Sequence, residues 1–161
     1  MLKIDMPVYW VKTTKVLYHH NSVIDKWLIL GEEDISKAIE KAHAAFFPVY
    51  HFSVHPGKTI PMFPAVSIGT FNTKGCRSKQ YPDGLQNSFP LYFVRYRLHN
   101  IFLDYLIFES GGLEEAKEKA QIMGDRLWTP MPQVIIVRQL QEQNSNGLYW
   151  LSAHLEEVNN D

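Results

Sequence analysis

The sequence ISKAIEKA at residues 35–42 recurs seventy-eight residues later as LEEAKEKA at residues 113–120. In both copies apolar residues fall three and four positions apart, which predicts an amphipathic helix with one buried face. Pro48 ends the first helix, and Pro130 ends the second at the latest, with Gly124 as an earlier alternative. The expected buried faces are Ile35, Ala38, Ile39, Ala42 and Phe46 in the first copy, and Leu113, Ala116, Ala120, Met123 and Leu127 in the second.

The similarity extends to the residues before each helix. His20-Asn21 is followed by SVIDKWLIL, and His99-Asn100 is followed by IFLDYLIF, so that Asp25 matches Asp104. Helices of any origin share Glu, Lys, Ala and Leu, so the helical match alone could be coincidental. Because the turn, the strand and the helix repeat together, we interpret the chain as a tandem duplication. Its pseudo-repeats, 1–78 and 79–161, are expected to form a single compact domain, 1–161.

Each copy contains the same order of elements. Two strands with a tight Asn-containing turn form a hairpin before the helix, and one or two strands follow it. Residues 55–90 separate the repeat cores and hold five prolines and four glycines, so we expect one short strand there and a mobile loop near 72–88. The expected strands are 8–19, 23–30, 49–54 and 65–71 in the first copy, and 91–98, 101–108, 134–140 and 148–155 in the second.

This order of elements predicts an α+β fold built of duplicated β-β-α-β(-β) units. One mainly antiparallel sheet with both helices packed on one face would have a ferredoxin-like order of elements. The alternative is two small half-domains, each with its own sheet and helix, packed together. Either arrangement hosts many unrelated functions, so the fold does not identify the activity.

Composition excludes several classes of protein. Lys and Arg number 16 against 17 Asp and Glu, and this near-neutral charge argues against a general nucleic-acid coat. The single cysteine, Cys76, cannot form an internal disulfide. The N-terminal stretch is interrupted by Asp5 and Pro7, and no apolar run approaches the roughly 20 residues that span a membrane. We therefore expect a cytoplasmic protein without a membrane partner.

Basic residues are concentrated in 72–99, where the acid is Asp83. An antiparallel sheet with helices on one face leaves its other face open. By strand alternation, Arg95, Arg97 and His99 share the open face with Phe93, and Trp150 lies on a similar face of the last strand. The candidate binding residues are Lys74, Arg77, Lys79, Arg95, Arg97, His99 and Trp150.

HFSVH at residues 51–55 is the nearest approach to a metal motif. On a strand, His51 and His55 share one face about 7 Å apart and could hold Zn or Ni with a third ligand. The sequence contains no HExxH motif and no cysteine pair that would complete such a site. No catalytic constellation is evident, so we expect no cofactor and lean against an enzyme.

Three functions remain, in order of preference. The first is a small binding or interaction protein that self-associates as a homodimer or takes a protein partner, through the open sheet face or an edge strand. The second is a nucleic-acid-associated protein that uses the basic loop and strand at 72–99. The third is a metal-dependent enzyme that uses His51 and His55.

Overall fold

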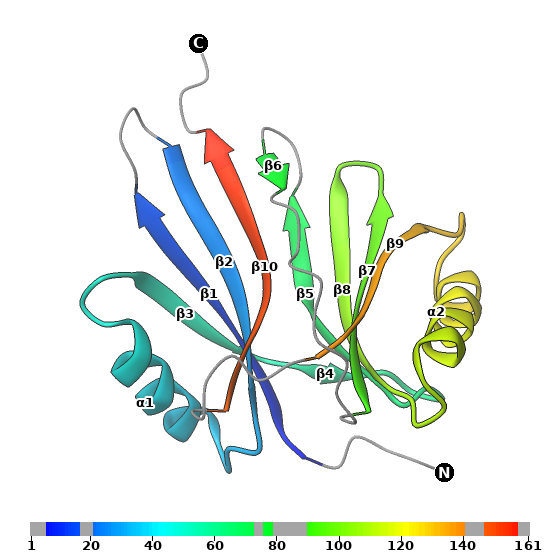
Figure 1. The fold of residues 1–161 in the computed structure, drawn as a ribbon, viewed down its shortest axis with the longest axis horizontal. Coiled ribbons are helices and arrows are strands. Elements are labelled where there is room, and N and C mark those ends of the chain that lie inside the picture. Colours follow the sequence, from blue (N-terminus) through cyan, green and yellow to red (C-terminus); the bar gives the residue numbers. More distant parts are fainter. Residues whose placement is uncertain (1–5, 17–20, 73–75, 79–89, 141–146, 158–161) are drawn as a thin grey trace. The chain divides into compact units, whose positions relative to one another are not determined.

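The computed structural model describes residues 6–16, 21–72, 76–78, 90–140 and 147–157. These residues form two α-helices and two antiparallel five-stranded sheets, which confirms the α+β class (Figure 1). Each helix packs on its own sheet, so the arrangement with one shared sheet is wrong, and the alternative with two sheets agrees with the structure. The chain divides into two compact units, which we name the α1 unit and the α2 unit after their helices.

The α1 unit is built mostly from the first half of the chain. Its strands are ordered β3-β1-β2-β10-β6, and β10 and β6 come from later in the sequence. The elements are β1 (Val8–Val16), β2 (Asn21–Leu30), α1 (Ile35–Phe46), β3 (His51–Pro56), β6 (Cys76–Ser78) and β10 (Leu148–Glu157). Apart from β6, residues 73–88 of the expected mobile loop lie outside the described residues, as do residues 17–20 of the first hairpin.

The α2 unit has the strand order β4-β5-β8-β7-β9. The second hairpin and the strand at 65–71 form as expected, and the helix continues through Gly124 to Leu127. Its elements are β4 (Lys58–Thr59), β5 (Ala65–Asn72), β7 (Leu91–Leu98), β8 (Ile101–Phe108), α2 (Leu113–Leu127) and β9 (Gln133–Gln139).

The two sheets have equivalent strand orders. The order β3-β1-β2-β10 in one corresponds to β9-β7-β8-β5 in the other. The fourth strand of each half, β5 or β10, therefore pairs with the second strand of the other half. The sequence did not predict this exchange, because the strand pattern identifies a strand without identifying its neighbour.

Each helix contacts its sheet through a row of buried residues that includes two alanines. Ala38, Ala42 and Phe46 are buried against Val11 and Ile29 in the α1 unit. In the α2 unit, the row is Ala116, Ala120 and Met123, against the aromatic rings of β7 and β8. The buried stripes are narrower than expected, because the flanking positions Ile35, Ile39, Leu113 and Leu127 are 40%, 43%, 40% and 36% exposed.

Candidate functional site

Arg95 does not lie on an open sheet face. Its side chain is fully buried, and its Nε and Nη2 donate hydrogen bonds of 2.7 and 2.8 Å to the two carboxylate oxygens of Asp104. The guanidinium carbon also lies 4.6 Å from the centre of the Phe102 ring, a cation–π contact. Phe93, beside it, is equally buried. The expected alternation is present, but this part of the face is covered, so Arg95 is unavailable as a surface contact.

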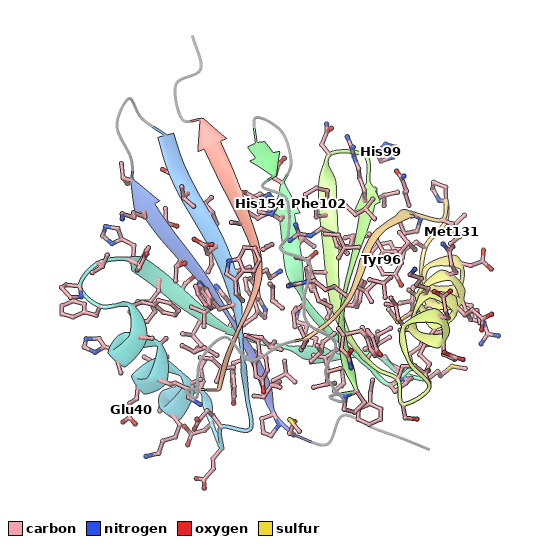
Figure 2. The ribbon with its side chains drawn as sticks, viewed as in Figure 1. Glu40, Tyr96, His99, Phe102, Met131 and His154 are labelled. Carbon is pink, nitrogen blue, oxygen red and sulfur yellow. The ribbon has the colours of Figure 1, made fainter. Side chains whose placement is uncertain are left out.

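Arg97, near the end of β7, and His99 are both exposed. His99 lies at the tip of the β7–β8 hairpin (Figure 2). Arg97 Nε donates to the backbone oxygen of His99 at 3.3 Å, and His99 adopts a positive φ of 55° in the turn. Lys74 and Lys79 lie outside the described residues, and Arg77 is on β6 with its side chain outside them too. Among the candidate basic residues between 72 and 99, those that the structure describes as exposed therefore lie at one hairpin tip.

Trp150 belongs to the α1 unit, whereas Arg95 and Arg97 belong to the α2 unit. It lies opposite Trp27 and donates from its indole nitrogen to Asp25 Oδ1 at 2.8 Å. A β-bulge follows, so Ser152 faces the opposite side from Trp150 rather than the same side. Trp150 shares its side of the sheet with Trp27, which packs against the α1 core, so the prediction that Trp150 lies on an open face is wrong.

Asp25 and Asp104, which the sequence comparison matched, are not equivalent in the structure; the two differ by one residue along their strands. Asp25 lies on the same side of its sheet as Trp27, whose neighbours pack on α1. Asp104 pairs with Arg95, on the side away from α2. Because strand side chains alternate, a shift of one residue reverses the face. Lys26, which is 5% exposed, is the structural equivalent of Asp104.

His51 and His55 lie on one face of β3, as the sequence predicts, but their surroundings do not favour a metal. The His55 ring stacks on Trp10 at 4.2 Å, and its Nε2 is 2.9 Å from Ser53 Oγ. Burial, followed by the positive charges of Lys12 and Lys26, lowers the pKa of His55. Within the described ranges, no group of three or more His, Cys, Asp or Glu residues could hold a metal ion.

The position of β3 in its sheet is more informative than its histidines. The four edge strands are β3, β6, β4 and β9. β6 has three residues and β4 has two, while β9 carries a bulge at Ile135. Short and bulged edges resist pairing with another chain. β3 has six residues in unbroken register with β1, and within the described residues no strand pairs with its outer side.

Exposed apolar side chains adjoin this edge on the side of α1. Phe47 and Val49, between α1 and β3, are 60% and 63% exposed. His43 stacks on Phe47 at 4.5 Å and meets Phe52 of β3 edge-on at 6.4 Å. We name β3 together with His43, Phe47 and Val49 the β3 edge. The amino-acid pattern predicts a strand here but not its position at a sheet edge, because strand neighbours come from distant segments.

Comparison of the chain with protein-family models, curated proteins and solved structures gave no significant match. Neither helix in the described residues is long and apolar enough to cross a lipid bilayer.

Proposed function

We propose that the chain is a non-enzymatic binding protein that accepts an extended segment of another protein as an additional strand beside β3. The observation that carries the proposal is the regular outer edge of β3, flanked by exposed apolar side chains on α1 and its following loop. Strand addition is a common mode of peptide recognition, in which main-chain hydrogen bonds provide affinity and alternate side chains provide specificity. A cytoplasmic location agrees with the single cysteine and is part of this proposal.

The energetics favour a modest and reversible interaction. Each main-chain hydrogen bond gained contributes about 0.5–1.5 kcal/mol net, and ordering the peptide opposes this gain. Covering the exposed Phe47 ring adds about 1.5–3 kcal/mol at most. We therefore expect dissociation constants in the micromolar to millimolar range for short peptides.

Hydrogen exchange and NMR titration test the proposal. The full chain is titrated with acetylated and amidated heptapeptides that alternate Val with a polar residue. We expect chemical-shift changes in β3 and α1, and slower exchange of the outward amides of β3. F47A should weaken binding, whereas I122A, which removes a 50% exposed side chain from α2, should not. Binding that leaves β3 amides unprotected would eliminate strand addition at this edge.

Self-association is the second candidate, since two copies could pair their β3 strands around a two-fold axis. Such pairing would bring the Lys12 side chains of both copies, which neighbour Ser53 across β1 and β3, to the same face. We favour a different partner, because self-pairing would gather positive charge from both copies on one face. Light scattering during gel filtration separates the two proposals: a stable dimer lost in the F47A variant would favour self-association.

A further inference from the structure

The two sides of the β3 edge differ in chemistry. On the side away from α1, the strand presents His51, Ser53 and His55. On the side toward α1 it presents Phe52 and Val54, which pack against the helix core. A strand added beside β3 would alternate in the same way, because paired residues share a face.

The side of His51 and His55 is cationic. Lys12 is exposed and lies opposite Ser53 on β1, where the small serine side chain leaves room for it to extend toward the edge. Lys26 on β2 lies directly opposite Lys12, on the same side of the sheet, and its Nζ is 4.5 Å from the centre of the Trp10 ring. The lowered pKa of His55 has these two lysines among its causes.

Within their described residues, these three strands place no acid on this side of the sheet. Across β1, β2 and β3 as described, the acidic residue is Asp25, and it lies on the α1 side, where it accepts from Trp150. An incoming carboxylate would therefore meet a positive potential on one face. The other face would offer it Phe52 and the exposed Phe47 ring.

We infer that the segment bound at the β3 edge alternates acidic and apolar side chains, with its carboxylates on the face of His51 and His55 and its apolar side chains beside Phe47 and Phe52. This inference rests on the proposed strand addition at β3 and specifies its partner. A residue opposite Ser53 on the added strand would lie two strand spacings, about 10 Å, from Lys12, a distance that extended Lys and Glu side chains together can span.

Four heptapeptides test the inference by NMR titration of the full chain at low salt. One alternates Glu with Val, and two others replace every Glu by Thr or by Lys. The fourth has the same composition as the first but groups its four Glu before its three Val. We expect the alternating Glu peptide to bind up to about fivefold tighter than the Thr peptide, as one exposed ion pair with Lys12 would give. The Lys peptide and the grouped peptide should bind more weakly than the alternating Glu peptide.

The variant K12Q should bring the affinities of the Glu and Thr peptides closer together, whereas K117Q, on α2, should leave their ratio unchanged. Lys117 is a matched control because it is also exposed, in an ion pair with Glu114. Equal binding of the Glu, Thr and Lys peptides would overturn the inference while strand addition stands. A Glu preference that survives K12Q would overturn the assignment to this face, and failure of every peptide to bind would overturn the proposed function itself.

Discussion

The buried pair of Arg95 and Asp104 provides the sharpest test of the structure. R95M removes the guanidinium while keeping an unbranched side chain of similar length, and leaves Asp104 charged and fully buried. Removing one partner of a buried ion pair costs about 3–5 kcal/mol, because the remaining charge loses both its solvation and its partner. We therefore expect R95M to lower the free energy of unfolding by this amount at neutral pH. Urea denaturation followed by circular dichroism measures it.

Two further variants separate charge from packing. R95M/D104L replaces the pair by apolar side chains, and should recover most of the lost stability or exceed the parent protein. R95K keeps the charge but cannot make both hydrogen bonds to the carboxylate, so we expect an intermediate loss. A loss below about 1 kcal/mol for R95M would mean that Arg95 is solvated, and the reasoning would be refuted.

Three other perturbations have defined outcomes. D34A removes the side-chain cap of α1, in which the Asp34 carboxylate accepts a hydrogen bond of 3.0 Å from the backbone N–H of Lys37. Urea denaturation should show the free energy of unfolding lowered by about 1 kcal/mol in D34A and by less in D34N. Equal losses in the two variants would exclude the cap. G124A places a methyl group 2.8 Å from the Tyr96 ring. The cost of overpacking, about 1–3 kcal/mol, should exceed the gain in helix propensity of up to about 1 kcal/mol, so the variant should be less stable. A raised melting temperature would contradict this close packing. A hydrogen bond from Lys119 is the main cause that lowers the pKa of Glu109, so ionised Glu109 stabilises the folded protein above the ordinary value of 4.5. This contribution is lost as pH falls through the lowered pKa. Thermal melts should therefore show E109Q less stable than the parent near neutral pH and equal to it in strong acid, and a difference that persists in acid would point to another cause.

Local periodicity predicted the elements well. Both helices begin at the first residue of the repeated segment, Ile35 and Leu113, and the second hairpin has the predicted bounds. The strand expected at 65–71, within the proline- and glycine-rich segment, forms as β5. These features depend on side chains within one segment, which is why a sequence reading can find them.

The candidate site was harder to predict, because its properties depend on which segments become neighbours. Arg95 was expected on an open face, but Asp104 on β8 pairs with it in a buried setting. Trp150 was assigned to the wrong face because a bulge cannot be seen in the alternation of side chains. His51 and His55 attracted attention as possible ligands, whereas the relevant property of β3 is its position at the edge of a sheet.

The two exchanged strands add a structural argument to the proposed duplication. β10 is bulged just after the residue opposite Trp27, and β5 is bulged just after the residue opposite Tyr105. Trp27 and Tyr105 are seventy-eight residues apart, the same offset as the two helices, and both contact the core beneath their helix. A bulge inserts an extra residue at one defined point of a ladder, so its occurrence at equivalent points is unexpected for unrelated strands. Because each half supplies the fourth strand of the other sheet, neither half can complete its sheet alone, and this mutual dependence would preserve both copies even as their surface residues diverge.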